Sequence, residues 1–285
     1  MLATLAMLLT LSAGAPPADL PDKNPTATPV AATAPGLHAA GTAPGAGGGD
    51  VDVELVLAVD TSRSMDYDEM RVQREGYISA LQHGEFITAV RGGLLGRIAI
   101  SYFEWAGEVD PSSVIDWQVI ETPEDAAAFA AKLAARPIAT QRRTSISAAI
   151  AYGTTSLVSN RYRGMRQVID VSGDGPNNIG EPVAPMRDKA VEAGVIINGL
   201  AIMLRPSATM GGLDKYYGDC VIGGPGSFVL PVHNAEDFAV AIRRKLVMEV
   251  SGLTPAKVHR IATAARPATT DCLLGEQQWR EFFDP

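Results

Sequence analysis

Residues 51–64 read VDVELVLAVDTSRS, and this stretch decides the fold. Its first nine residues are rich in Val and Leu, which is typical of a buried β-strand. The strand then ends at Asp60, Ser62 and Ser64, whose side chains offer oxygen atoms at alternating positions. Hard divalent cations prefer oxygen ligands, and open α/β sheets bind ligands at the carboxyl ends of their strands. The stretch therefore predicts a cation site, although the same residues could instead cap the helix that follows.

Two further loops offer oxygen ligands at the same kind of position. Thr144 lies where a predicted loop gives way to a predicted helix over residues 145–158. Asp174 comes after a second apolar run, residues 168–171. Because right-handed crossovers place the carboxyl ends of parallel strands at one edge of a sheet, we expect these loops to meet there. The predicted metal ligands are Asp60, Ser62, Ser64, Thr144 and Asp174.

This set of residues resembles the von Willebrand factor type A (vWA) family. The metal-ion-dependent adhesion site (MIDAS) of that family consists of Asp-x-Ser-x-Ser, a Thr at a loop-to-helix junction and an Asp after a later strand, and all five positions match here. The resemblance spans about residues 51–250. Within that span the chain resembles in particular a bacterial family of extracytoplasmic proteins, domain of unknown function 1194, through residues 174–178 (DGPNN) and 217–220 (YGDC). One departure is Gly173, where vWA domains often have Thr before the Asp.

The order of apolar patterns predicts the fold class. Strand-like and helix-like stretches alternate, which favours an α/β fold: a vWA/Rossmann-like, doubly wound, mainly parallel sheet with helices on both faces. A turn signal at Asp110 and Pro111 predicts an antiparallel hairpin that forms one edge. Asn234 is expected to cap the last helix. Strands are predicted at residues 51–59, 97–105, 114–120, 168–171 and 195–203, and helices at residues 65–90, 123–135, 145–158 and 183–193 and after residue 234.

The predicted ligand set indicates which ion suits the site. Only Asp60 and Asp174 carry charge, so a bound dication is not over-neutralised and keeps part of its Lewis acidity. Mg²⁺ fits best because it prefers octahedral oxygen coordination and retains exchangeable water, and Mn²⁺ or Ca²⁺ are the alternatives. The vWA resemblance implies a non-enzymatic role, in which a protein partner completes the ion's shell with an Asp or Glu side chain.

Several residues beside the predicted ligands are candidates for the partner-binding rim. Arg63, Arg142 and Arg143 are expected to form a basic collar, since arginine binds carboxylates through two parallel hydrogen bonds. Glu104 and Trp105, at the end of a predicted strand, are expected to reach the same rim, and Trp is a common interface anchor. The alternatives are that the arginines pair with acidic residues of the adjacent helix and that the Trp covers the core.

Two other function classes stay open. A metal-independent interaction module would bind through another surface, for example Tyr216, Tyr217 and the Gly-rich segment 223–226. A metal-dependent hydrolase is the third class. Against it, the chain has no Gly-x-Ser-x-Gly elbow, neither cysteine has a matching catalytic histidine signature, and the four histidines show no zinc-ligand spacing.

Composition divides the chain into four parts. Residues 1–15, with an apolar run and small residues at 13–15, predict a signal peptide, although no Lys or Arg precedes the run. Residues 16–50 are rich in Ala, Pro and Gly and predict a disordered linker. Residues 51–250 form the predicted vWA-like domain, and residues 251–285 form a tail. We therefore expect an exported protein, periplasmic or secreted, without a transmembrane segment.

The cysteines and the charge add two expectations. Cys220 and Cys272 are the only cysteines, and in an exported protein they predict a disulfide that tethers the tail, with two free thiols as the alternative. The formal net charge is −8, and no contiguous basic stripe occurs, which argues against nucleic-acid binding. We expect the protein to be a monomer.

Overall fold

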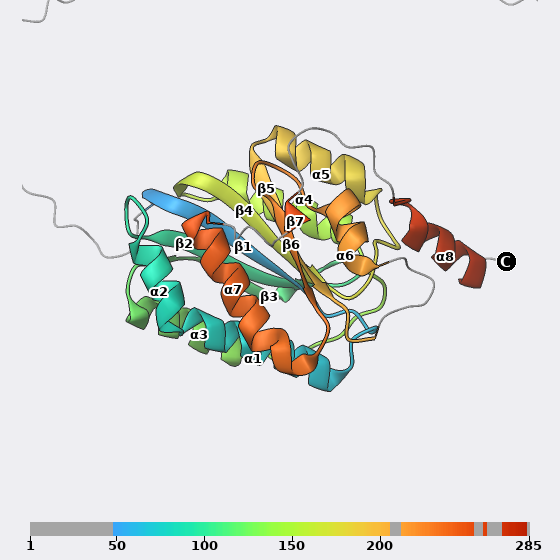
Figure 1. Ribbon diagram of the computed structural model, residues 1–285, viewed down its shortest axis with the longest axis horizontal. Helices are drawn as coiled ribbons and strands as arrows, with labels where there is room; N and C mark the ends of the chain where they lie inside the picture. The colour runs from blue at the N-terminus through green and yellow to red at the C-terminus, as the bar shows by residue number, and fades with distance from the viewer. Residues whose placement is uncertain (1–47, 206–211, 254–258, 261–269, 284–285) are drawn as a thin grey trace, which may run out of the picture. The chain divides into compact units, whose positions relative to one another are not determined.

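A mainly parallel β-sheet lies between two layers of helices in the computed structural model, which describes residues 48–205, 212–253, 259–260 and 270–283 (Figure 1). The strand order is β3-β2-β1-β4-β5-β6-β7. Strands β1, β2, β4, β5 and β6 are parallel, while β3 and β7 are antiparallel to their neighbours. The strands are β1 (Asp50–Asp60), β2 (Ile98–Trp105), β3 (Val109–Ile120), β4 (Arg163–Gly173), β5 (Val195–Ile202), β6 (Phe228–Val232) and β7 (His259–Arg260).

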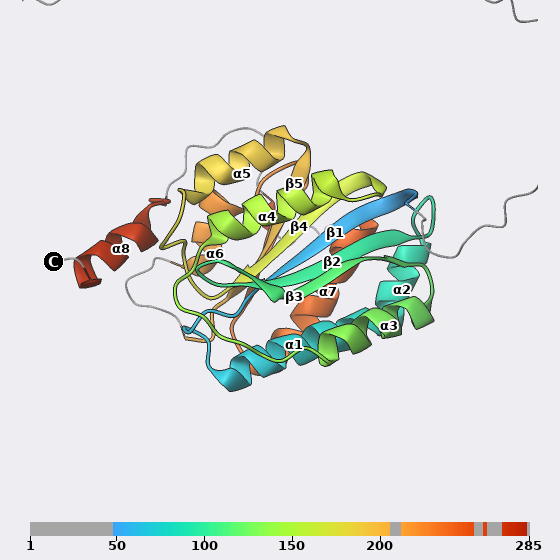
Figure 2. The same ribbon diagram turned by 180° about the vertical axis from the view of Figure 1, so that it is seen from behind.

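The helices cover both faces of this sheet, as Figures 1 and 2 show from opposite sides. One apolar core lies under α1, α2, α3 and α7, and the other lies under α4, α5 and α6. The helices are α1 (Tyr67–Leu81), α2 (Gly84–Arg91), α3 (Pro123–Ala134), α4 (Ile146–Ser159), α5 (Val183–Glu192), α6 (Leu213–Tyr216), α7 (Phe238–Ser251) and α8 (Leu274–Phe283). A π-helical turn (Tyr217–Val221) follows α6, and a 3-10 turn (Ala235–Asp237) precedes α7.

The predicted α/β fold is confirmed. Strand β1 lies at the centre of the sheet and is covered on both faces, which explains the unbroken apolar run at its residues 55–59. The predicted antiparallel edge strand is β3, and in addition the two-residue β7 pairs antiparallel with β6 on the other edge. The predicted signal peptide and the linker up to residue 47 lie outside the described residues, and Asp50 already belongs to β1.

Three local predictions are wrong, each for a local reason. The helix expected over residues 65–90 is two helices, because His83 ends the first and caps α2 by accepting a hydrogen bond from Glu85 N. The hairpin turns at residues 106–108, so Pro111 lies inside the edge strand β3, where a missing N–H is tolerated. Asn234 does not cap α7; its side chain donates to Asp237 instead.

Among the described residues, none of the helices combines the length and the apolar character that crossing a bilayer requires.

Candidate metal site at the carboxyl edge of the sheet

The sheet brings the predicted ligands of β1 and β4 to the same edge. These strands are parallel neighbours in which Val59 pairs with Ser172. Asp60 is therefore the last residue of β1, and Asp174 follows the last residue of β4, at the same edge. The loop before α4 reaches this edge through Gln141, which forms a β-bridge with Ser62. Three loops that are far apart in sequence thus meet where the sequence predicted a cation site.

Four of the five predicted ligands form one chain of hydrogen bonds. Asp60 Oδ1 accepts from the backbone N–H of Ser62 at 2.7 Å. The hydroxyls of Ser62 and Ser64 are 2.8 Å apart. Ser64 Oγ then donates to Asp174 Oδ1 at 2.6 Å. The backbone N–H of Ser62 and the hydroxyls of Ser62 and Ser64 thus connect the two carboxylates.

Thr144, the fifth predicted ligand, is held against the loop that carries Asp174. Its N–H donates to Asn178 Oδ1 at 2.9 Å, and its carbonyl accepts from Asn178 N–H at 2.8 Å. Its hydroxyl points toward Gly175, since a Cβ on that glycine would lie 4.0 Å from Thr144 Oγ1. The Thr144 side chain is buried. The structure thus places Thr144 beside the Asp174 loop, and no hydrogen bond among the described residues joins its hydroxyl to the other four.

The two carboxylates are poorly solvated, and their residues fit a bound cation. Asp60 is fully buried, and its Oδ2 atom has no hydrogen-bond partner among the described residues. Burial raises the pKa of Asp60 well above its usual value, and the Asp174 carboxylate raises it further. Burial also raises the pKa of Asp174 to about 6, although a hydrogen bond from Ser64 opposes this. A buried carboxylate oxygen without a partner is costly, and a divalent cation with its shell of water would stabilise it.

The donor chemistry agrees with a hard ion. Ser62, Ser64 and Thr144 contribute neutral oxygens, and Asp60 and Asp174 contribute charge, which suits Mg²⁺, Mn²⁺ or Ca²⁺. Within the described ranges, no three His, Cys, Asp or Glu side chains cluster as a metal site. An ion at this edge would therefore depend on the hydroxyl groups.

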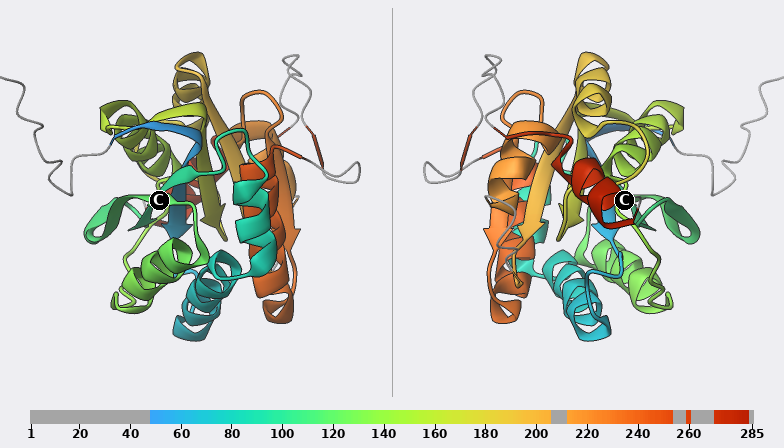
Figure 3. Two further views of the ribbon diagram at one scale, coloured as in Figure 1. Left: turned by 90° about the vertical axis from the view of Figure 1, so that its left-hand side faces the viewer. Right: turned by 90° about the vertical axis from the view of Figure 1, so that its right-hand side faces the viewer.

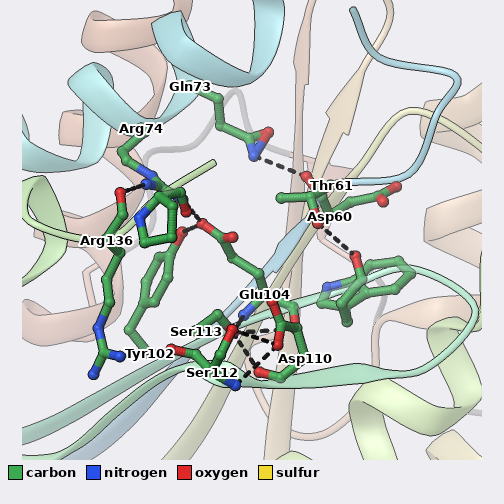
Figure 4. Close-up of polar contacts among 12 residues, drawn as sticks. Asp60, Thr61, Gln73, Arg74, Tyr102, Glu104, Asp110, Ser112, Ser113 and Arg136 are labelled. Carbon is green, nitrogen blue, oxygen red and sulfur yellow. Dashed lines mark hydrogen bonds and ion pairs between the residues drawn. The ribbon is translucent and has the colours of Figure 1, made fainter. Parts of the chain in front are cut away.

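Two buried side chains of α1, Gln73 and Arg74, form hydrogen bonds that hold this edge of the sheet in place (Figure 4). Gln73 Nε2 donates to the carbonyl of Asp60 at 3.2 Å. Arg74 forms an ion pair with Glu104, and it also donates to the carbonyls of Arg136 and Pro137 in the loop that leads to Thr144. The expectation that Glu104 reaches the rim is therefore wrong. Its carboxylate is buried beneath the rim, where it neutralises Arg74.

The predicted rim residues have different surroundings. Arg63, Arg142 and Arg143 are exposed beside the predicted ligands. Within the described part of the chain none of them forms an ion pair with α1, and the guanidinium of Arg143 instead lies 4.6 Å from the ring centre of Trp279. Trp105 is only 1% exposed, so the prediction of a partner-binding role for it is corrected. Helix α4 covers this side of β2, and Trp105 packs into the core beneath it.

A cavity of about 320 Å³ adjoins the predicted ligands Ser64 and Asp174, and no sequence motif predicted it. Arg205, just after β5, donates to the carbonyl of Ser64 at 2.8 Å and forms an ion pair with Glu69. The one sequence signal for a role of Arg205 is that it follows the carboxyl end of a predicted strand, which is where parallel sheets bind their ligands. The cavity is lined by Ser64, Met65, Glu69, Asp174, Ile202, Leu204 and Arg205.

The tail is joined to the loops of the site. Cys220 and Cys272 form the predicted disulfide, with Cα atoms 5.5 Å apart. Helix α8, which was not predicted, lies in front of the carboxyl edge in the right-hand view of Figure 3. Asn177 is fully buried; its Nδ2 donates to Glu276 Oε1 at 2.7 Å, and its Oδ1 accepts from Ser147 N–H at 3.0 Å. Gly275 of α8 packs against the Asn177 backbone so closely that a Cβ would lie 2.1 Å from the carbonyl oxygen.

The alternative binding surface of the sequence analysis is contradicted in part. Tyr216 and Tyr217 are 1% and 0% exposed, so neither side chain is available to a partner. Both rings belong to the apolar core beneath α4 and α5.

The comparison with protein families agrees with this architecture. The family model described as "Protein of unknown function (DUF1194)" matches residues 50–254. The chain belongs to this family. No protein with a curated description matches this DUF1194 protein.

Solved structures with vWA-type folds are similar to the DUF1194 protein. Proximal thread matrix protein 1 from the mussel byssus, with a zinc-occupied MIDAS motif, aligns with a TM-score of 0.53 and 15% identity, over 72% of this chain and 49% of that one. The pilus adhesin SpaC from Lactobacillus rhamnosus GG aligns with a TM-score of 0.52 and 13% identity, over 70% and 30% of the two chains. The DUF1194 protein thus spans half or less of either relative, and these likenesses show the fold alone.

Proposed function

We propose that this protein is an exported, non-enzymatic binding protein that engages a protein partner through a divalent metal ion. Asp60, Ser62, Ser64, Thr144 and Asp174 would hold the ion. The observation that carries the proposal is the chain of hydrogen bonds from Asp60 to Asp174, together with the buried Asp60 Oδ2 that lacks a partner. The fold of the mussel protein with an occupied MIDAS supports it.

The partner in this proposal presents an Asp or Glu side chain. A bound dication would supply the positive charge that such a carboxylate needs, and the exposed side chains of Arg63, Arg142 and Arg143 would add to it. The cavity next to Ser64 and Asp174 has an apolar wall of Met65, Ile202 and Leu204 and a polar wall with Arg205. These walls suit an acidic residue followed by an aliphatic one.

Mg²⁺ is the proposed ion, with Mn²⁺ or Ca²⁺ as alternatives, because every candidate ligand atom is an oxygen. The two other function classes have less support. The tyrosines proposed for a metal-independent surface are buried. A hydrolase has less support because, among the described residues, this chain of hydrogen bonds contains no histidine base: Asp60 accepts from the Ser62 N–H, and Asp174 accepts from the Ser64 hydroxyl.

Calorimetric titration of the full chain with Mg²⁺, Mn²⁺ and Ca²⁺ tests the proposal. We expect saturable binding of at least one ion, lost in Asp60→Ala and in Asp174→Ala. Asp68→Ala is the matched control, because Asp68 is exposed on the adjacent α1 and contacts only Arg71 among the described residues. A folded wild-type protein that binds none of the three ions contradicts the proposal.

The acidic partner is tested separately, with peptides as probes. We expect a peptide with a Glu-Leu step to bind in the presence of the ion, and binding to be lost with a chelator or when Glu is replaced by Gln. Equal binding of the Glu and Gln peptides would rule out the acidic-ligand part of the proposal.

A further inference from the structure

Tyr217 lies next to the candidate site although it comes from a fourth segment of the chain. It begins the π-helical turn that follows α6, and π-helical turns are rare and often occur at functional sites. Its ring packs over β5 at Gly199, where a Cβ would lie 2.7 Å from Tyr217 Cδ1. Its hydroxyl lies over Gly173 of β4, where a Cβ would lie 2.6 Å from Tyr217 Oη. Two glycines on neighbouring strands therefore make room for this one side chain.

The hydroxyl of Tyr217 ends beside the Asp60 carboxylate. The Cβ position at Gly173 that lies 2.6 Å from Tyr217 Oη also lies 2.9 Å from Asp60 Oδ2. Neither oxygen has a hydrogen-bond partner among the described residues, and both side chains are fully buried. An unpaired buried polar group costs about 1–3 kcal/mol, so two of them side by side call for an explanation.

The chemistry of the pair gives that explanation. A phenol keeps its proton near neutral pH, so Tyr217 can donate a hydrogen bond and a carboxylate can only accept one. A purely apolar role for the ring would be met equally by Phe, without the cost of burying a hydroxyl.

We propose that Tyr217 is a positioning residue of the metal site, whose hydroxyl donates to the Asp60 carboxylate when the ion is bound. This inference rests on the proposed function. The donated bond would fix the orientation of Asp60 Oδ2, while Asp60 Oδ1 is already fixed by the N–H of Ser62. This arrangement also explains why residue 173 is a glycine, because a side chain there would displace both the Tyr217 hydroxyl and the Asp60 carboxylate.

Tyr217→Phe in the full chain tests the inference, because it removes the hydroxyl and keeps the ring. We expect Mn²⁺ affinity, measured by calorimetry, to fall about tenfold, as it does for other groups that orient a metal ligand. Tyr162→Phe is the matched control: Tyr162 is also buried, but it lies just before β4, at the opposite end of that strand from Asp174. Circular dichroism and thermal unfolding would show that each variant is folded.

A double variant separates positioning from packing. Gly173→Ser alone is expected to weaken Mn²⁺ binding, because its Cβ would collide with Tyr217 Oη. In the Tyr217→Phe background the collision with the hydroxyl is gone, but the added Cβ still lies 2.9 Å from Asp60 Oδ2, so we expect Gly173→Ser to weaken Mn²⁺ binding less than it does in the wild type. Wild-type Mn²⁺ affinity in folded Tyr217→Phe overturns the inference and leaves the proposed function standing. A wild-type protein that binds no ion overturns both.

Discussion

Replacing Lys245 of α7 with Met is expected to destabilise the fold, because two buried carboxylates would lose the cation that they share. The Lys245 amine contacts Asp170 of β4 and Glu249 of α7, and all three side chains are at most 1% exposed. Asn198 also donates to Glu249 Oε1, at 3.2 Å. Met has a similar length and is apolar, so the substitution tests the charge rather than the volume.

The expected loss is about 3–5 kcal/mol of unfolding free energy, the usual cost of removing one partner from a buried ion pair. The loss should grow with pH. Burial and the Asp170 carboxylate raise the pKa of Glu249 to about 8. In the unfolded chain the pKa of Glu249 is near 4.5, so between about pH 4.5 and pH 8 the folded protein holds a proton that the unfolded chain has released. The free energy of unfolding therefore falls as the pH rises from 4.5 to 8. Without Lys245 both carboxylates hold their protons more tightly, so the fall becomes steeper.

Urea unfolding at pH 5.5 and at pH 8, followed by circular dichroism, measures both effects. Arg244→Met is the matched control, because Arg244 is the preceding residue of the same helix and is exposed. We expect the control to differ from wild type by less than about 0.5 kcal/mol at both pH values. If Lys245→Met loses no more than the control, or loses the same amount at both pH values, the electrostatic account of this cluster is refuted.

Three other substitutions or treatments have distinct expected outcomes. Glu249→Gln should flatten the decrease of stability between pH 5 and pH 8 in urea unfolding, and an unchanged slope would assign the titration to another group. Reducing the Cys220–Cys272 disulfide, which closes a 52-residue separation, should lower the unfolding free energy by about 4 kcal/mol, measured with and without dithiothreitol; equal stability would speak against the tether. Gly275→Ala should displace α8 from Asn177 and speed proteolysis of the tail, whereas Gly84→Ala, with no atom within 4 Å of the added methyl, should not; equal rates would show that α8 tolerates the methyl.

Local patterns predicted the edge of the sheet well. Asp60, Ser62 and Ser64 are close in sequence, and the end of an apolar strand locates them without knowledge of the rest of the chain. Asp174 is far away in sequence, but the rule for parallel strands places it at the same edge, and the register of β1 with β4 agrees. These inferences needed only periodicity and handedness.

Features that depend on long-range packing were not predictable in this way. Trp105 and Glu104 end a strand, and whether they face solvent depends on α4 and on Arg74, which lies 30 residues from Glu104. Arg205 reaches Ser64 across 141 residues without a motif. The break at His83 was missed because apolar spacing continues from α1 into α2, and only the imidazole cap separates the helices.

The contact of Gly275 with Asn177 has a consequence for where this protein can be divided. The family model ends at residue 254. The residues beyond it nevertheless supply Cys272, which is bonded to Cys220, and Glu276, whose carboxylate accepts a hydrogen bond from the Asn177 amide. A fragment cut at the family boundary would leave a lone buried thiol at Cys220 and would remove the carboxylate acceptor of the Asn177 amide, in the loop that carries Asp174. The stretch that the family model matches is thus shorter than the folded unit, which also includes residues 270–283.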